Sequence, residues 1–427
     1  MENLLVITGS KILASGFDEP SDATIEIDKV TGKILRIHPI RSSIDSYSSF
    51  LVGDDKKKDF IDAGNDVVMP GLIDTHVHLN EPGRTDWEGF ETGTKAAAAG
   101  GVTTVIDMPL NSIPPTTTVD NLNQKINVTK NKSWVDIGFY GGVIPGNQSG
   151  VKGFKCFLIE SGVDEFPCVN EQDVRMAFET LKVREFLESR PSSLEIDAIS
   201  FVIELTKEYN KSVRTHIVHL SASDALDAIT KAKLVDGLPI TVETCFHYLC
   251  LSAEEIPAGR TEFKCCPPIR DDKNRDKLWK ALIDGVIDCI VSDHSPCTSN
   301  LKEGGFGKAW GGISTLQFGL PVLWTEAKRR NLSSFNNLVN WLSRNPAKLV
   351  GLNDRKGEIK VGYDADIIIW NPEESFKITE DSIEFKNKVT PYLGKEFYGV
   401  VKKTILRGKI IYDDNEITDI PLGKLLL

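Results

Sequence analysis

The sequence contains no apolar run that approaches the roughly 20 residues needed to span a membrane. Its first residues, MENLLVITGSKIL, lack the basic start and the long apolar stretch of a secretory signal. The eight cysteines show neither the regular spacing of a disulfide framework nor a CxxC pair typical of a zinc ribbon. We therefore expect an intracellular protein, cytoplasmic by default, with no membrane association and with cysteines that are reduced and mostly buried.

Basic residues are in the minority, since 50 Lys and Arg stand against 61 Asp and Glu and give a formal net charge of −11. This charge disfavours nucleic acid as a partner and fits a small-molecule substrate. The content of 41% apolar and 26% charged residues is typical of a globular chain. At roughly 150 residues per domain, the length of 427 residues predicts two or three domains, or one large barrel with an accessory piece.

Both ends of the chain carry short β-rich runs broken by turn residues. The runs are LLVITGSKIL, ATIEID and ILRIHPI near the start, and ADIIIW and VKKTILRGKIIY near the end. The economical interpretation is one small β-sandwich domain formed by residues 1–66 and 360–427, with a larger domain, 67–359, inserted between them. Two unrelated β appendages are the alternative.

In the central part, apolar strands alternate with longer helical patterns, which is typical of an α/β fold built around parallel strands. Seven strand-like runs occur: VVMPGLIDTHVHL, VTTVIDMP, WVDIGFYGG, GFKCFLI, VRTHIVHLS, PITVETCFHYL and VIDCIVSDHS. Helical patterns at 88–99, 171–188, 194–210, 223–234 and 272–284 fall between or after them. The alternation predicts a TIM (β/α) barrel whose active site lies in the loops that follow the strands.

Two intervals do not fit a complete barrel. Between Gly141 and Gly153 the link is GVIPGNQSGVK, which is shorter than the dozen or more residues of a usual parallel crossover. Between Lys155 and Val213 two helical patterns follow each other with no apolar strand. We therefore expect a barrel that lacks one strand and one helix.

The pair His76 and His78 closes the first long apolar run. Positions i and i+2 of a strand face the same side, so both imidazoles can approach one metal ion. The alternative is two surface histidines, which the position at a strand end disfavours. Asp293 ends the run VIDCIVSD, where a carboxylate can bind metal and handle a proton during hydrolysis, although an isolated Asp at this place is more often a turn residue.

Two further side chains can reach the same face. His216 and His219 are three residues apart and lie on opposite faces of a strand, so we expect His219 to face the site and His216 to be structural or outward-facing. Lys155 interrupts an apolar strand. It is either a protonated lysine that reaches the barrel mouth, or a neutral amine carboxylated by carbon dioxide whose two oxygens could bridge two metal ions.

These motifs carry a family resemblance. The run HVHLNEPGRTDWEGFETGTKAAAAGGVTTVIDMPLNSIPPT, followed by TVETCFHYL, CPPIRDDKNRDKLWKAL, SDHSPCT and KAWGGIS, resembles the allantoinases, cyclic amidohydrolases related to dihydroorotases and hydantoinases. The resemblance spans most of the chain. Asn80 stands where dihydroorotases usually carry Arg, which favours allantoinase.

The resemblance implies a metal-dependent barrel that hydrolyses allantoin to allantoate in purine breakdown. It implies two divalent ions, most often zinc, bridged by a carboxylated Lys155, and an assembly of identical copies such as a homotetramer. The implied metal ligands are His76, His78, Lys155, His219 and Asp293, and Asp293 also transfers protons. The implied substrate contacts are Asn80 and backbone groups around Cys266, Pro267 and Gly311.

One implied ligand is missing. The family has a strand ending in a His-Ala-Glu type motif between the lysine strand and the HIVHLS strand, yet this chain has no histidine between Lys155 and Val213. The missing strand and the missing ligand coincide, which indicates a deletion variant with a damaged second metal site.

Three functions therefore compete. The first is an active allantoinase that uses one ion or a replacement ligand such as His216 or Glu160. The second is a silent allantoinase-derived subunit that acts through assembly with intact chains. The third is a hydrolase of hydantoins or dihydropyrimidines, which Asn80 and the run KAWGGIS disfavour.

Overall fold

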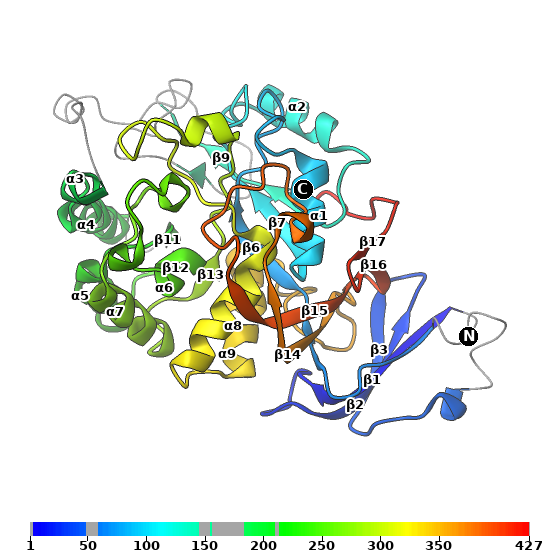
Figure 1. Ribbon diagram of the computed structural model, residues 1–427. Coiled ribbons are helices and arrows are strands. Elements are labelled where there is room, and N and C mark those ends of the chain that lie inside the picture. The colour runs from blue at the N-terminus through cyan, green and yellow to red at the C-terminus, as the bar shows by residue number, and fades with distance from the viewer. Residues whose placement is uncertain (1–2, 48–58, 145–153, 156–182, 210–212, 427) are drawn as a thin grey trace.

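The computed structural model describes residues 3–47, 59–144, 154–155, 183–209 and 213–426 (Figure 1). Two bodies are visible in this part of the chain. The strands of the N-terminal segment lie at one end of the molecule, and the larger body with most helices lies at the other (Figure 1). No helix in the described ranges has the length and apolarity that crossing a bilayer requires.

Strands from both ends of the chain pair in one sheet of nine strands. Its order is β17-β16-β15-β14-β5-β1-β2-β3, with β4 pairing beside β1. The bounds are β1 Leu4–Ile12, β2 Ser21–Asp28, β3 Lys33–His38, β4 Phe60–Asp62, β5 Val67–Pro70, β14 Ile367–Lys377, β15 Glu396–Leu406, β16 Lys409–Asp413 and β17 Glu416–Ile417. Alternating β-branched residues from β1, β2, β14 and β15 form its apolar core.

Among the described residues, the larger body contains three groups of parallel strands. The orders are β6-β7-β8, β9-β10 and β11-β12-β13, and a parallel bridge between Val77 and His294 joins the first group to the segment after β13. The bounds are β6 Leu72–Val77, β7 Val102–Asp107, β8 Asp136–Phe139, β9 Gly141–Gly142, β10 Phe154–Lys155, β11 Thr215–Ile217, β12 Ile240–Cys245 and β13 Cys289–Val291. This is the α/β arrangement of a barrel-type fold, consistent with the predicted class.

Helices cover the outside of these strands. The α-helices are α1 Phe90–Ala99, α2 Val119–Thr129, α3 Val183–Glu188, α4 Ser192–Glu208, α5 Leu226–Thr230, α6 Phe246–Cys250, α7 Asp272–Ile283, α8 Gly319–Arg329, α9 Phe335–Val339 and α10 Asn345–Leu349. Two short π-helical turns, η5 Lys231–Val235 and η10 Asn340–Arg344, extend α5 and join α9 to α10. Short 3₁₀ turns are η1 Ile44–Tyr47, η4 Ser223–Ala225, η6 Ala253–Glu255, η7 Thr261–Phe263, η8 Ser299–Lys302, η9 Leu316–Phe318 and η11 Glu380–Ser382.

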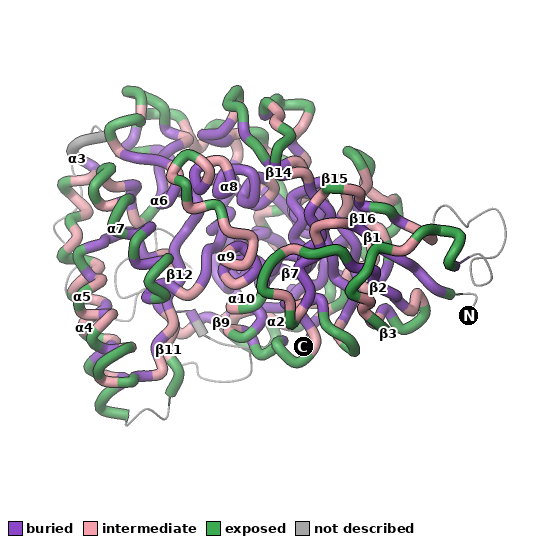
Figure 2. Tube along the Cα trace, turned by 90° about the horizontal axis from the view of Figure 1, so that it is seen from below, coloured by how far each residue is buried: buried purple, intermediate pink, exposed green. Residues whose placement is uncertain are grey.

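Local sequence explains where several helices begin. The Thr118 side chain accepts a hydrogen bond from the backbone N–H of Asn121 at the start of α2, and Asp271 does the same for Asn274 at the start of α7. The alanines of α1 are buried, because small side chains let this helix approach the strands closely. Burial is greatest around the central strands, whereas α4 and α5 run along the outside with exposed stretches (Figure 2).

Two features differ from the sequence pattern. The apolar run at 67–79 is two strands, because the chain leaves the nine-stranded sheet after Pro70 and β6 begins at Leu72. The turn residue between them is Gly71, where a Cβ atom would lie 2.4 Å from the Thr103 side chain. The helical patterns also omitted α2 and α8, which the structure contains.

The two irregular intervals lie partly outside the described residues. β9 and β10 pair in parallel on either side of the short Gly-rich link, of which 145–153 are not described. Between Lys155 and Thr215 the described residues, 183–209 and 213–214, form only helices and turns. The predicted helix at 171–188 is described from Val183 onward.

Candidate metal centre

Three predicted residues converge at the carboxyl ends of β6 and β13. His76 lies on β6, His78 follows its last residue, and Asp293 follows β13 by two residues. The Nε2 atoms of both histidines lie 3.3 Å from the same atom, Oδ1 of Asp293. The backbone N–H of His78 donates to the carbonyl of His294 at 2.8 Å and holds the two segments together. All three side chains are buried.

Glu243 on β12 fixes the orientation of His76. Its Oε1 lies 2.5 Å from His76 Nδ1, and a carboxylate at this place favours a proton on Nδ1 when an ion occupies Nε2, the nitrogen that faces Asp293. Burial alone would raise the pKa of the Glu243 carboxyl, but the charge and hydrogen bonds of His76 and His216 hold this pKa well below its usual range. A single Glu in the strand ITVETC gave no sequence signal of this role.

Asn111 faces the second histidine of the pair. Its side-chain amide lies 3.3 Å from His78 Nδ1, and its Oδ1 is buried with no hydrogen-bond partner in the described part of the chain. The opposite orientation of the same amide would let Oδ1 accept the Nδ1–H of His78 and would free Nε2 for a metal ion. Sequence reasoning missed this residue as well.

Asp293 is held as an anion. Burial opposes its ionisation, but the neighbouring His76 and His78 lower the pKa of the carboxyl far below its usual range. Burial lowers the pKa of His78, which favours the neutral imidazole that metal binding requires. The group therefore offers two imidazole nitrogens and one carboxylate oxygen.

Lys155 and His219 lie next to each other beside this group. Lys155 Nζ is 3.1 Å from His219 Nε2, and the ring centroids of His219 and His76 are 5.4 Å apart. Burial and the adjacent Lys155 charge hold the pKa of His219 well below its usual range, so this ring is neutral. His216 lies apart from this contact: its ring nitrogens bond with Thr241 Oγ1 at 2.8 Å and with Glu243 Oε2 at 2.9 Å.

Residues at the strand ends adopt an uncommon backbone conformation. Asn80, His219 and Asp293 have φ values of 62°, 39° and 41°, in the left-handed region that non-glycine residues rarely occupy. Such conformations cluster at functional sites, where the surrounding structure holds them. Three of the predicted site residues therefore share this conformation.

The predicted substrate contacts fall into two places. Asn80 is buried, its Nδ2 donates to the Pro296 carbonyl at 3.4 Å, and its Oδ1 has no hydrogen-bond partner among the described residues. Cys266 and Gly311 lie side by side, because a Cβ on Gly311 would be 3.0 Å from Cys266 Sγ. The carbonyl of Pro267 accepts a hydrogen bond from the Tyr248 hydroxyl at 2.7 Å.

The described residues contain three groups that could hold a cation. They are His76, His78 and Asp293; His216, Glu243 and Cys289; and Cys245, His247 and Asp293. In each group the donor atoms lie within 4.8 Å of one another. The first group has the imidazole and carboxylate donors that zinc and similar divalent ions use, together with the carboxylate–histidine contact that normally supports such a ligand. Its residues therefore fit a divalent metal ion.

Known proteins resemble this chain along most of its length. The family model "Amidohydrolase family" matches residues 67–411. The chain is 48% identical to the allantoinase of Streptomyces avermitilis over 399 residues, covering 86% of this chain and 88% of the relative. It is 47% identical to the allantoinase of Saccharomyces cerevisiae, covering 84% and 86%. The L-hydantoinase (dihydropyrimidinase) structure from Arthrobacter aurescens superimposes with a TM-score of 0.85 at 26% identity, covering 100% and 99%.

Another relative shows that this chain is shorter within the shared region. The probable allantoinase 2 of Dictyostelium discoideum is 43% identical and is covered to 93%, with 99% of this chain aligned. The alignment extends over 487 positions, whereas this chain has 427 residues, so at least 60 positions have no counterpart here. With matches of this extent, the chain belongs to the amidohydrolase family, whose enzymes are metal-dependent, and within it to the allantoinases.

Proposed function

We propose that this chain hydrolyses the cyclic amide of allantoin to allantoate, a step of purine breakdown. The observation that carries the proposal is the convergence of His76 Nε2 and His78 Nε2 on one oxygen of Asp293, with His76 oriented by Glu243. The allantoinases of similar sequence support the substrate. Hydantoinases share the fold at lower identity and favour no other substrate over allantoin.

His76, His78 and Asp293 would hold the ion, for which zinc is the expected metal. When bound, a divalent ion acts as a Lewis acid and makes water a stronger nucleophile near neutral pH. Both histidines face Oδ1 of Asp293, so the other carboxylate oxygen can accept the proton of the attacking water and return it to the leaving ring nitrogen. Burial of the three side chains excludes bulk water from this proton transfer.

Lys155 and His219 would contribute to a second ion of the type found in the family, with Lys155 carboxylated. Their direct contact of 3.1 Å bears on this proposal, because a carboxyl group on Nζ needs the space that now separates the two nitrogens. Carboxylation therefore requires the two side chains to move apart. Glu160, the acidic candidate for a replacement ligand, lies outside the described residues.

A deletion explains the absence of the other ligand. The sequence has no histidine between Lys155 and Val213, and the Dictyostelium relative has at least 60 positions without counterpart in this chain. We place the lost strand and helix of the barrel in this interval and in the short link before Gly153. The second function, a silent subunit that acts through assembly with intact chains, follows if the remaining ligands hold no reactive ion.

Asn80 and the backbone around Cys266, Pro267 and Gly311 would position the substrate ring. The unpartnered Oδ1 of Asn80 can accept a hydrogen bond from a ring N–H. The proposed domains are a β-sandwich of residues 1–66 and 360–427 and a barrel of residues 67–359. We also propose a cytoplasmic homo-oligomer that acts on a small molecule.

The test is allantoin hydrolysis by the purified chain with zinc or manganese and bicarbonate, beside an Asp293→Asn variant. Turnover that Asp293→Asn reduces at least a hundredfold would support the proposal. A folded chain that turns over no allantoin would refute it and favour the silent subunit. Hydantoin and dihydrouracil, assayed in parallel, decide the substrate: faster turnover of either would overturn the assignment of allantoin.

A further inference from the structure

We propose that Cys245, His247 and Asp293 form a second metal-binding site that shares Asp293 with the site of His76 and His78. This site takes a zinc-like ion through a thiolate, an imidazole and a carboxylate oxygen. The proposal deepens the proposed function. It rests on that function, which assigns the first ion to His76, His78 and Asp293. It requires neither Lys155 nor the histidine that the chain lacks.

The fold places the three donors together. Cys245 is the last residue of β12, and His247 follows in α6. Cys245 pairs with Val291 in β13, two residues before Asp293, so both strands end at the same level. The Cys245 sulfur, a ring nitrogen of His247 and a carboxylate oxygen of Asp293 all lie within 4.8 Å of one another, and all three residues are buried.

His247 carries the strongest indication of a ligand. Its ring is completely buried, and neither Nδ1 nor Nε2 has a hydrogen-bond partner among the residues that the structure describes. Buried polar groups normally find a partner, because an unsatisfied one loses its contact with water without compensation. The ring packs edge-on against Tyr248 at a centroid distance of 4.3 Å, which leaves its nitrogens free for an ion.

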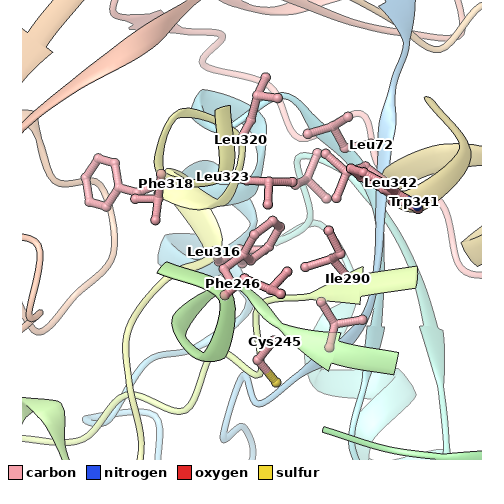
Figure 3. Packing of buried hydrophobic residues seen from close by; sticks show 14 of the residues in the cluster. Leu72, Cys245, Phe246, Ile290, Leu316, Phe318, Leu320, Leu323, Trp341 and Leu342 are labelled. Carbon is pink, nitrogen blue, oxygen red and sulfur yellow. The ribbon is translucent and has the colours of Figure 1, made fainter. Parts of the chain in front are cut away.

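The apolar surroundings hold the segment rigidly. Figure 3 shows Phe246 packed among Leu316 and Ile290, with the Cys245 sulfur directed away from this cluster. The residue between the two proposed ligands is therefore anchored in the core. Anchored neighbours keep the donors in place, which a metal site needs to select its ion.

The other cysteine-containing group is a weaker candidate. It contains His216, Glu243 and Cys289. Both ring nitrogens of His216 already have partners, and Glu243 already bonds with His76 and His216. An ion there must break existing hydrogen bonds. An ion at His247 would instead bind a ring nitrogen that has no hydrogen-bond partner among the described residues.

Asp293 can serve both ions through one carboxylate oxygen, which has two lone pairs, and its other oxygen then remains available to accept a proton. In two-metal hydrolases the ions lie about 3.5–4 Å apart, a separation that one bridging carboxylate can span. The thiol of Cys245 must lose its proton on binding, as metal-bound thiols do. The proton passes to solvent, and no oxidation or reduction is involved.

Cobalt(II) titration of the metal-free full-length chain tests the site, because cobalt bound to thiolate gives a charge-transfer absorption in the near ultraviolet. We expect a saturable band and, by elemental analysis, one ion per chain more than in Cys245→Ser. Cys245→Ser should remove the band and one ion, and His247→Gln should weaken cobalt binding at least tenfold. Cys289→Ser, a matched variant of a buried cysteine on the adjacent strand, should keep both.

Several results would overturn the site. One is saturation of the chain with cobalt without a thiolate band. The other is a band that survives Cys245→Ser and is lost in Cys289→Ser. Circular dichroism of each variant shows whether it is folded. For a variant that is less stable, competition between zinc and bound cobalt measures its metal affinity by a second route.

Activity separates this inference from the proposed function. Allantoin turnover by a chain that binds one ion without a thiolate band would leave the function standing and refute the second site. Two ions with the band and no turnover would support the site and refute the function.

Discussion

Glu243 offers the sharpest test of how the metal centre is organised. Its carboxylate contacts His76 Nδ1 at 2.5 Å, His216 Nε2 at 2.9 Å and the backbone N–H of His219 at 3.2 Å. Glu243→Gln keeps the shape but replaces one oxygen by an amide that only donates. One of the two histidines then faces a donor, and His76 loses the acceptor that directs Nε2 toward the ion.

Loss of a carboxylate that orients a metal-binding histidine typically lowers metal affinity 10- to 100-fold, about 1.4–2.7 kcal/mol. We expect Glu243→Gln to weaken zinc binding by that factor, measured by competition with a chromophoric chelator. The lower value applies if the remaining oxygen stays on His76, and the upper value if it stays on His216.

Glu26→Gln is the matched control, because Glu26 is also a buried carboxylate beside a histidine, with His38 Nε2 at 2.9 Å, but lies in the nine-stranded sheet. It should leave zinc affinity unchanged. A folded Glu243→Gln chain that binds zinc within twofold of the unaltered chain would refute the role assigned to Glu243.

Glu26, Lys125 and Lys155 each make a contact whose loss can be measured. Burial opposes ionisation of Glu26, but His38 and its other neighbours lower the pKa of this carboxyl. The stabilisation by Glu26 is therefore present above the unfolded pKa near 4.5 and is lost as pH falls through the folded value. The difference in unfolding free energy between the unaltered chain and Glu26→Gln, measured in urea, should shrink on acidification, and a constant difference from pH 7 to pH 3 would contradict this. Lys125 Nζ lies 2.5 Å from Asp107 Oδ2, and both side chains are buried. Lys125→Met leaves the Asp107 charge without its partner, so it should lower the free energy of unfolding by about 3–5 kcal/mol. A loss under about 1 kcal/mol in urea would show that the pair is dispensable. If Lys155 is carboxylated, bicarbonate should raise the zinc content of the unaltered chain and have no effect on Lys155→Arg, whereas equal responses would exclude carboxylation as the cause.

The sequence was informative where side-chain period and strand ends coincide. The spacing of His76 and His78 predicted that both face one side, and the structure brings both to the same Asp293 oxygen. The alternation of strands and helices predicted the α/β class. Each of these depends on local geometry that neighbouring residues determine.

The sequence pattern could not predict contacts between distant segments. Glu243 contacts His76 although the two residues are 167 positions apart in the sequence, and no motif near either residue predicts the contact. His247 is distinguished by missing hydrogen bonds, which only the packed structure reveals. The division at Gly71 escaped notice because both sides of this glycine are apolar, and the two strands differ only in the partners they find.

The pairing of β5 with β14 has a consequence for the order in which the chain can fold during synthesis. β5 pairs on one edge with β1, which is made early, and on the other edge with β14, where Met69 and Ile368 are partners, so its second neighbour is available only after most of the chain has left the ribosome. Until then one edge of the strand that leads into β6 has no partner, and an unpaired edge is open to aggregation. His76 and His78 are thus among the early residues to be made, yet the sheet that precedes them is among the last parts to be completed.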